Sequence, residues 1–339
     1  MKAIRLNNIQ NLQLVDIPKP LKKEGQVLLR LASVGICGSD IHYLVNGGTD
    51  SSTIESPLIL GHEFSAYISE GVNNGKLAAI DPAISCGHCE FCREGSPNFC
   101  TELLFAGSPG MDGAMQEFLY WPENNVYPLT EGFTPEQGAM LEPLGVAIHA
   151  LKLAKIKPGM DIGIIGAGPI GLLTLQLAKS IGVGRIFVTD KLNNRLEAAI
   201  KCGATDVYLA DGTEISRVHS ETNTRGLDVV FEAAGDDGTA VETAVQFAKF
   251  GAKIVLIGIP EKDETAFSAS TARRKGLTIK VSRRMQHTYP TANRLVSEGL
   301  IDFEPLITHR YPLVSFQEAF DTAAARVGIK VMINMSDNA

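Results

Sequence analysis

The chain has 339 residues, of which 45% are hydrophobic and 20% are charged, as in ordinary globular proteins. This length exceeds what one hydrophobic core usually supports, so we expect two domains. The net charge of −7 argues against a nucleic-acid or acidic-membrane partner, because those surfaces attract concentrated Lys and Arg, and a small-molecule ligand is expected instead.

The N-terminal sequence MKAIRLNNIQ contains no apolar signal core, so we expect a cytoplasmic protein. Six cysteines in such a reducing compartment indicate metal binding or catalysis, and not disulfides.

Residues 1–145 predict a β-rich lobe. Short alternating or apolar runs are separated there by Gly, Pro and Asn, which is typical of strands and turns. The runs are Gln13–Val15, Gln26–Ser33, Phe64–Ile68, Leu77–Ile80 and Ala114–Tyr120.

Two polar stretches lie in this lobe: G-I-C-G-S-D-I-H-Y over residues 35–43 and G-H-E over residues 61–63. Cys37, His62 and Glu63 offer sulfur, nitrogen and oxygen donors, a set that suits a catalytic zinc ion with an open position. Each residue alone has a plainer explanation, since a lone Cys is often a small buried hydrophobe and a His-Glu pair is often a surface coincidence.

Four cysteines follow in the pattern C-x2-C-x2-C-x7-C, namely Cys86, Cys89, Cys92 and Cys100. Four thiolates at these spacings can close a tetrahedral shell around zinc and hold a loop that lacks a hydrophobic core. Because all four positions would be filled, this zinc is predicted to be structural.

An iron–sulfur cluster is the competing interpretation, because three cysteines at two-residue gaps also begin a ferredoxin-type run. That run has its fourth cysteine after three residues and then proline, whereas here the gap is seven residues and Thr101 follows. Cysteines without any ligand are the plainer alternative. His88, inside the cluster, is expected to be a solvated loop residue.

The stretch that begins at Asp161 has the outline of a dinucleotide site: a short apolar strand, a glycine turn, an apolar helix and a second strand. Gly166 permits the tight turn, Gly168 lets the backbone approach a pyrophosphate, and Gly171 allows the helix to pack on the strand. The start of the helix offers free N–H groups to phosphates, so Pro169 and Ile170 are expected at the cofactor.

Asp190 ends the second strand, 190 − 171 = 19 positions after the last of these glycines. An acid at this place accepts hydrogen bonds from the adenosine ribose and would repel a 2′-phosphate, so NAD is favoured over NADP. A membrane helix is the alternative for the uncharged run Ile162–Ala178. Three glycines and a proline interrupt the first half of that run, which favours the buried dinucleotide fold.

From residue 146 to 280, strands alternate with helical stretches, which predicts a doubly wound parallel sheet of Rossmann type. The tail from residue 281 has too few apolar residues for its own core and is expected to pack on the first lobe. The predicted domains are therefore 1–145 with 281–339, and 146–280. The runs after the dinucleotide stretch are Arg195–Lys201, Val207–Leu209, Leu227–Ala233, Thr239–Phe250 and Lys253–Ile257.

The order of these motifs, with E-P-L at 142–144, resembles the zinc-dependent medium-chain dehydrogenases over essentially the whole chain. The resemblance implies an α/β fold with a GroES-like β-rich catalytic domain beside the Rossmann domain. The sorbitol (polyol) dehydrogenase branch is most similar, because Glu142 stands where alcohol dehydrogenases proper place a cysteine ligand. Cys202, the remaining cysteine, lies in the nucleotide domain and cannot fill that place.

In the polyol branch, the resemblance implies that the catalytic zinc is held by Cys37, His62 and Glu63. It implies that Glu142 completes the shell, directly or through a bound water. With the cysteine loop, two zinc ions per chain are expected.

The resemblance also assigns Ser39 and His42 to a relay that carries the proton to solvent. Their plainer roles are a turn-capping hydroxyl and a surface imidazole. Tyr43 and Arg284 are the implied substrate contacts. If the match to the family segment shifts by one residue, Arg283 takes the place of Arg284; otherwise Arg283 is expected at the cofactor.

On the cofactor side, Arg195 resembles the family's adenosine contact, and residues Ile257, Gly258 and Ile259 are expected beside the nicotinamide. The plainer role of Arg195 is a solvated helix charge. Met285 departs from the polar aromatic residue expected there, so a phosphorylated polyol, bound by the extra arginine, is an alternative substrate. The segment between residues 68 and 82 is shorter than the family loop and predicts a tight hairpin.

We therefore predict an NAD- and zinc-dependent oxidoreductase that interconverts the secondary hydroxyl of a polyol and a ketose. The enzymatic alternative is a dehydrogenase for threonine or another amino alcohol. The non-enzymatic alternative is a nucleotide-binding protein without turnover. A complete Cys-His-Glu-Glu set argues against the latter. Relatives imply a homo-oligomer, a dimer or tetramer.

Overall fold

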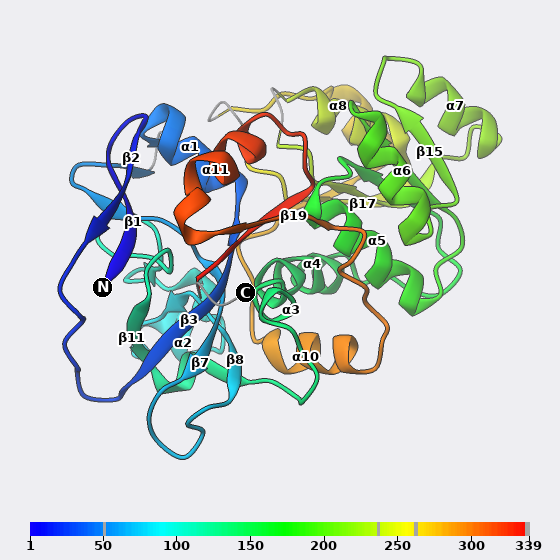
Figure 1. The fold of residues 1–339 in the computed structure, drawn as a ribbon. Helices are drawn as coiled ribbons and strands as arrows, with labels where there is room; N and C mark the ends of the chain where they lie inside the picture. The colour runs from blue at the N-terminus through cyan, green and yellow to red at the C-terminus, as the bar shows by residue number, and fades with distance from the viewer. Residues whose placement is uncertain (50–51, 236–237, 261–263, 336–339) are drawn as a thin grey trace. The chain divides into compact units, whose positions relative to one another are not determined.

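The computed structural model describes residues 1–49, 52–235, 238–260 and 264–335, and these form two compact units (Figure 1). Unit 1 comprises residues 1–142, 289–297 and the described residues from 307 on, and unit 2 comprises residues 143–288 and 298–306. The tail thus contributes segments to both units. The domain boundaries expected near 145 and 280 stay predictions.

Unit 1 is built around β3 (Gln26–Ile36), whose second half is buried throughout. One edge of β3 pairs with β7 (Glu63–Ile68). The other edge pairs with β11 (Phe118–Pro122) and, near the carboxyl end of β3, with β20 (Lys330–Asn334). All three pairings are antiparallel, so the last strand of the chain lies beside one of the first.

The main sheet of unit 1 has the order β12-β8-β7-β3-β20-β19, and β1, β2 and β6 form a smaller sheet. Strands β7 and β8 form an antiparallel hairpin in the segment where the sequence predicts one, and residues 69–76 connect them. The other elements of unit 1 are β1 (Lys2–Asn8), β2 (Asn11–Asp16), α1 (Gly38–Asn46), β4 (Gly48–Thr49), β5 (Ser52–Thr53), β6 (Leu58–Ile59), β8 (Leu77–Ile80), β9 (Ala83–Ile84), α2 (Glu90–Arg93), η1 (Pro97–Phe99), β10 (Leu104–Phe105), η2 (Glu123–Asn125), β12 (Val126–Pro128), α3 (Pro135–Ala139), α10 (Tyr289–Ser297), β19 (Ile307–Pro312), η3 (Leu313–Ser315) and α11 (Phe316–Ala324).

Unit 2 contains a parallel six-stranded sheet with the order β15-β14-β13-β16-β17-β18. This is the doubly wound order, in which the first strand lies at the centre and the chain then fills each side in turn. The α/β fold class is therefore confirmed. The strands are β13 (Ile162–Ile165), β14 (Ile186–Asp190), β15 (Asp206–Leu209), β16 (Leu227–Glu232), β17 (Ala248–Leu256) and β18 (Thr278–Val281).

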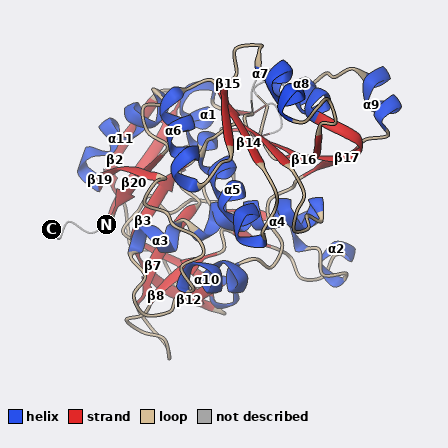
Figure 2. Ribbon diagram, turned by 90° about the vertical axis from the view of Figure 1, so that its right-hand side faces the viewer, coloured by secondary structure: helices blue, strands red, loops and turns tan. Residues whose placement is uncertain are grey.

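Helices lie on both faces of this sheet (Figure 2). Apolar residues of α7, α8 and α9 form one buried cluster with strand residues such as Phe187 and Val230. The central strand β13 is buried along its whole length, which explains its unbroken apolar sequence. The helices are α4 (Leu141–Ala154), whose first residues belong to unit 1, α5 (Pro169–Ile181), α6 (Asn193–Cys202), α7 (Glu214–Glu221), α8 (Thr239–Phe247) and α9 (Ala269–Lys275).

Several predicted boundaries were wrong. The strand expected from Lys253 already begins at Ala248, and the strand expected to end at Ser33 continues to Ile36. The helical stretch expected over Thr239–Phe250 ends at Phe247, because Ala248 already pairs with Leu227 as the first residue of β17. The strand expected from Ala114 begins only at Phe118, because the N–H groups of residues 113–115 donate to the carbonyls of residues 59–61.

Trp121 is the only tryptophan of the chain and is fully buried in the core of unit 1. Its ring meets Phe64 edge to face at 6.0 Å, and its indole N–H donates to the carbonyl of Asp81 at 2.8 Å. Phe320, in α11, belongs to the same core cluster. None of the helices in the described ranges is long and apolar enough to cross a bilayer.

We predict that Phe320→Ala lowers the free energy of unfolding of unit 1 by about 3–5 kcal/mol, the usual cost of truncating a buried Phe. Urea unfolding followed by Trp121 fluorescence measures this, because the single tryptophan lies in that unit. Val314→Ala is the control, since Val314 is 61% exposed in the same segment. An equal effect of both substitutions would contradict a structural role for the C-terminal segment.

Candidate functional site

Cys37 lies where β3 ends and α1 begins. Its backbone N–H donates to Oδ2 of Asp40 at 2.9 Å, in the first turn of the helix. Asp40 is fully buried, and its Oδ1 accepts from the N–H of Gly61 at 3.2 Å. One carboxylate therefore joins the two polar stretches that the sequence singles out.

His62 and Glu63 follow Gly61, whose φ of +95° favours glycine, and Glu63 is the first residue of β7. Both side chains are buried. Glu63 lies opposite Gly35 in the ladder, and a Cβ atom at Gly35 would collide with Oε2 of Glu63. The glycine in G-I-C-G thus provides the space for this carboxylate.

The structure brings one donor atom each of Cys37, His62 and Glu63 to within 4.8 Å of one another. Sulfur, nitrogen and oxygen donors at this mutual distance fit a zinc ion with three protein ligands and an open position. Glu142 is buried at the start of α4 but is not part of this compact group. The coordination of Glu142, directly or through water, stays a prediction.

The electrostatics of these residues also fit a cation. Burial disfavours a charged His62, but the negative charges of Asp40, Cys37 and Glu142 raise its pKa to about 10. Burial and the nearby Glu63 raise the pKa of Glu142 to about 7, against the opposing charges of His62 and Lys330. The acidic groups around His62 therefore favour positive charge at this place, as a cation site requires.

Lys330, on β20, is a site residue that the sequence analysis missed. Its Nζ donates to both carboxylate oxygens of Glu63, at 2.8 and 2.5 Å, and to the carbonyl of Ile36 at 3.1 Å. Both charged side chains are 3% exposed. The available signal was a single lysine before the apolar residues V-M-I of the strand sequence K-V-M-I-N, but nothing local pairs it with a residue 267 positions away.

The four cysteines of the 86–100 loop lie close together in the structure. The Sγ atoms of Cys86, Cys89, Cys92 and Cys100 all lie within 4.8 Å of one another, and those of Cys86 and Cys92 are 4.0 Å apart. Sulfur atoms bound tetrahedrally at ~2.3 Å from zinc would be ~3.8 Å apart, so the set fits a structural zinc. None of the six cysteines, all of which the structure describes, is in a disulfide.

The backbone supports this sulfur cluster. The N–H of Cys86 donates to Sγ of Cys100, and the N–H of Cys89 donates to Sγ of Cys86. The N–H of Cys92 leads the contacts that lower the pKa of Cys89 to about 6, whereas burial and the neighbouring thiols raise the pKa of Cys92 to about 11. His88 is exposed, with its Nε2 3.8 Å from a carboxylate oxygen of Glu102, as expected for a solvated loop residue.

In unit 2 the glycine turn has the geometry of a dinucleotide loop. Gly166 has φ +95°, and a Cβ there would lie 2.8 Å from the backbone of Ala234. A Cβ at Gly171 would collide with the carbonyl of Gly166. By contrast, a Cβ at Gly168 would meet only a guanidinium nitrogen of Arg195, at 3.8 Å, so the space above Gly168 is open.

Helix α5 begins directly after Gly168, with Pro169 and Ile170 in its first turn. Asp190 braces the turn, since its Oδ2 accepts from the N–H of Ala167 at 2.7 Å and its Oδ1 from that of Leu192 at 2.9 Å. Arg195 lies with Nη1 3.8 Å from the same carboxylate. These residues meet at one end of β13 and β14, as a dinucleotide site requires.

Residues 257–259 follow β17 at the same edge of the sheet. The N–H groups of Ile257 and Gly258 donate to the carbonyl of Glu232, at the end of the neighbouring strand β16. The buried side chain of Glu232 accepts from the N–H groups of Ala234 and Gly235. Glu232 is a second residue that the sequence analysis missed; it holds the two loops together.

The remaining predicted residues lie on two elements. Ser39, His42 and Tyr43 are on α1 and are half-buried. Arg283 and Arg284 lie in the segment after β18 in unit 2, where Arg284 has φ +55°. Their joint contact with one substrate stays a prediction.

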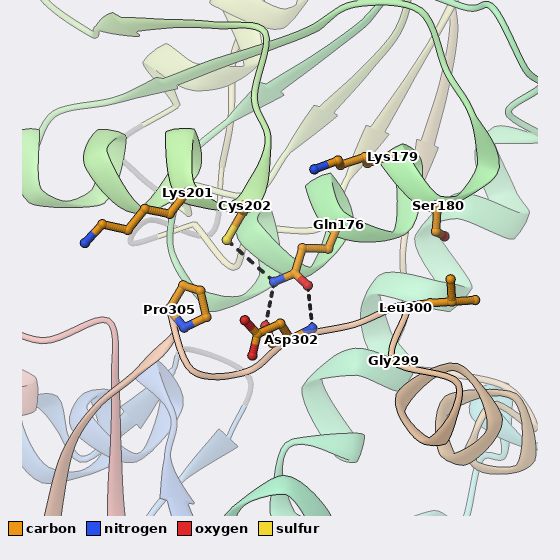
Figure 3. A pocket seen from close by; sticks show the side chains of 9 residues that line it. All are labelled: Gln176, Lys179, Ser180, Lys201, Cys202, Gly299, Leu300, Asp302 and Pro305. Atoms are coloured by element: carbon orange, nitrogen blue, oxygen red, sulfur yellow. Dashed lines mark hydrogen bonds between the residues drawn. The ribbon is translucent and has the colours of Figure 1, made fainter.

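A pocket of about 370 Å³ lies in unit 2, where Gln176 binds the backbone N–H and C=O of Asp302 (Figure 3). Its side-chain amide also donates to Sγ of the buried Cys202. None of the predicted site residues lines this pocket, so it carries no functional assignment. The lining residues are Gln176, Lys179, Ser180, Lys201, Cys202, Gly299, Leu300, Asp302 and Pro305.

Comparison with known proteins identifies relatives over the whole chain. Two family profiles match: an alcohol dehydrogenase GroES-like domain at residues 23–131 and a zinc-binding dehydrogenase at residues 169–298. Sorbitol dehydrogenase from Bacillus subtilis (strain 168) is 34% identical over 95% of this chain and 93% of its own length. L-idonate 5-dehydrogenase from Vitis vinifera is 34% identical over 98% of this chain and 94% of its own.

Solved structures of dehydrogenases also align with the whole chain. Galactitol-1-phosphate dehydrogenase from Escherichia coli aligns with a TM-score of 0.90 and 29% identity, over 99% of this chain and 100% of that one. A structure described as a short chain alcohol dehydrogenase from E. coli CFT073, complexed with NADH, aligns with a TM-score of 0.90 and 28% identity, over 99% of both chains.

We predict that Lys330→Met destabilises the metal-free protein by about 3–5 kcal/mol, because it leaves the Glu63 carboxylate buried without its cation. Urea unfolding of unit 1 in the presence of a chelator measures this through Trp121 fluorescence. Added zinc is expected to recover part of the loss, since the metal supplies positive charge to the same carboxylate.

Lys2→Met is the matched control in unit 1, because the Lys2–Asp16 ion pair is exposed and its loss should have no measurable effect. Equal stability of Lys330→Met and the wild type would show that the buried pair is not needed.

Proposed function

The chain belongs to the zinc-binding medium-chain dehydrogenases, in the branch that contains sorbitol dehydrogenase and D-xylulose reductase, and we propose that it uses NAD to oxidise a secondary hydroxyl of a polyol, reversibly. The observation that carries the proposal is that donor atoms of Cys37, His62 and Glu63 lie within 4.8 Å of one another. Glu142 is also buried, and among the described residues the group contains no further thiol. Such a set keeps one metal position open for a substrate.

We assign the catalytic zinc to Cys37, His62 and Glu63, with Glu142 acting through water. The structural zinc is assigned to the four cysteines of the 86–100 loop, and NAD to the glycine turn with Asp190 and Arg195. The chemistry of the donor sets supports these assignments.

When bound, zinc makes the substrate hydroxyl more acidic, and NAD accepts a hydride from the adjacent carbon. The chain supplies the other parts. Asp40 fixes Cys37 and Gly61 through their N–H groups, and it lies 3.8 Å from Nδ1 of His62, which orients the imidazole. Lys330 keeps the carboxylate of Glu63 in place.

The proton released from the hydroxyl must leave a buried site. Ser39 and His42 lie three residues apart on α1, so they share one face of that helix, directly after Cys37. We assign them to the relay that carries the proton to solvent, a role in which imidazole can accept and donate near neutral pH.

Tyr43 and Arg284 are the proposed substrate contacts, with Arg283 toward the cofactor. The structural match to galactitol-1-phosphate dehydrogenase keeps a phosphorylated polyol as the second candidate substrate, because an additional arginine would bind a phosphate. A homo-oligomer in the cytoplasm is proposed from the resemblance alone.

The direct test combines metal analysis with turnover. Elemental analysis should find about two zinc ions per chain, as the two donor sets require. Reduction of NAD should then appear with sorbitol, xylitol or L-idonate, or with galactitol 1-phosphate if the substrate is phosphorylated, and not with L-threonine. One zinc ion per chain without turnover would favour the nucleotide-binding alternative.

We predict that Cys37→Ser lowers kcat/KM by about 10³-fold or more, because several kcal/mol of charge stabilisation depend on the metal. NADH binding, followed by cofactor fluorescence, should stay within about twofold, because the glycine turn is in the other unit. Cys202→Ser is the control, since Cys202 belongs to neither zinc set, and it should keep full turnover. Unchanged turnover of Cys37→Ser would refute the catalytic-zinc assignment.

Two glycines of the turn should differ in their response to alanine. Gly168→Ala is expected to fold normally, since φ is −72° and the space is open, but to weaken NAD binding at least about tenfold by filling the approach to the pyrophosphate. Gly171→Ala should destabilise unit 2 itself, because its methyl group would collide with the Gly166 carbonyl. Calorimetric titration with NAD and thermal unfolding separate the two effects; normal NAD affinity of Gly168→Ala would place the cofactor elsewhere.

A further inference from the structure

We propose that Phe105 is a positioning residue for the ligand His62, and that it couples the metal state of the cysteine loop to the catalytic donor set. The proposal rests on the two zinc sites assigned above. It concerns Phe105, which none of the sequence motifs contains and which is not a ligand in either donor set.

The contact itself is between two rings. The ring centroids of Phe105 and His62 are 5.2 Å apart, with an angle of 44° between the ring planes. His62 is 7% exposed. Asp40 faces Nδ1 of the imidazole at 3.8 Å, so the carboxylate restrains one edge of the ring and Phe105 restrains one face. Rotation of the imidazole away from the metal position would have to displace one of them.

Phe105 belongs to the base of the cysteine loop. It forms β10 with Leu104, and its partner in the ladder is Ala83 of β9, three residues before Cys86. The base is fastened by the N–H of Ala106, which donates to the carbonyl of Pro82 at 3.0 Å, and by the side chain of Asn125, which donates to the carbonyl of Ala83 at 2.7 Å. The two-stranded ladder thus connects the base of the cysteine loop to the ring that contacts His62.

Gly107 and Gly113, which follow Phe105, pack closely against Gly61, the residue before His62. A Cβ at Gly107 would lie 2.9 Å from the nitrogen of Gly61, and one at Gly113 would collide with the Gly61 carbonyl. The same carbonyl accepts from the N–H of Ala114 at 2.9 Å. A shift of residues 105–114 therefore cannot occur without moving the segment that carries His62.

The loop depends on its metal for order. Its cysteine sulfurs accept from backbone N–H groups such as those of Cys86 and Cys89, and its aromatic pair, Phe91 and Phe99, meets edge to face at 6.2 Å, with Phe99 47% exposed. A segment with so little buried apolar surface is held by the zinc ion when that ion is bound. Loss of the structural zinc would then loosen β9 and β10, and Phe105 would no longer restrain the imidazole.

The test loads metal-free protein with Co²⁺ and resolves the two sites by absorption, because the four-cysteine site has four thiolate ligands and the catalytic site has one. Phe105→Ala should weaken Co²⁺ binding at the catalytic site by about 10- to 100-fold, the range for residues that orient a metal ligand, and should change its d–d spectrum. Binding at the four-cysteine site should stay within about twofold.

Phe99→Ala is the matched control: it removes an aromatic ring from the same loop, but that ring meets Phe91 and not His62. Phe105→Leu keeps most of the volume and is the second variant if Phe105→Ala fails to fold, as judged by Trp121 fluorescence; its effect should have the same sign and be smaller. Equal catalytic-site affinities of the Phe105 variants, the Phe99 variant and the wild type would overturn the proposal.

A double-mutant cycle tests the coupling. Cys92→Ser, which disables the four-cysteine site, should weaken Co²⁺ binding at the catalytic site in the wild-type background and have little further effect on Phe105→Ala. Additive effects would show that the two metal sites communicate by another route. Because these measurements need no turnover, they separate failure of this inference from failure of the proposed activity: a wild type that binds two metal ions and oxidises polyols, with an unaffected Phe105→Ala, contradicts only the coupling.

Discussion

The structure depends most on one buried ion pair, between Glu63 and Lys330. Taking both charges out of water is costly unless each finds a close partner. The fold meets this demand by placing β20 against β3 and by leaving Gly35 without a side chain, so that the carboxylate fits between the glycine and the ammonium group. The arrangement of the proposed metal donors follows, because His62 and Glu63 lie at the start of β7 and Cys37 directly follows β3, the strand that pairs with both β7 and β20.

The two units position their candidate site residues in different ways. In unit 1, irregular segments at the ends of strands carry the polar donors, and buried hydrogen bonds from Asp40 hold those segments in place. In unit 2, the parallel sheet brings loops to one edge by topology alone, and Asp190 and Glu232 brace these loops through backbone N–H groups. In both units an acid acts as a brace near the place where a positively charged or phosphate-bearing group is proposed to bind.

Much of the fold could be predicted from the sequence, because local patterns determine it: the glycine turn, the four-cysteine spacing and the apolar strands around residue 162 each act over a few residues. Family resemblance then joined Cys37, His62 and Glu63, which spacing alone could not. Lys330 and Phe105 were missed because their partners are remote in sequence. Neither a single lysine in a strand nor a single phenylalanine after a loop indicates a contact with a proposed metal ligand. The helix end at Phe247 was missed because the apolar period continues into the strand, and only pairing with Leu227 ends the helix.

The separation of 267 positions between Glu63 and Lys330 bears on how unit 1 forms during synthesis. A ribosome makes the proposed ligands Cys37, His62 and Glu63 together with the four cysteines of the loop, but the cation that neutralises Glu63 is made 267 residues after this carboxylate. Until then β3 lacks one neighbour along its carboxyl half and a carboxylate in the future core has no lysine beside it. The nascent segment before Lys330 is therefore an incomplete unit that is exposed to misassembly, and early metal capture or a chaperone would protect it until Lys330 is made.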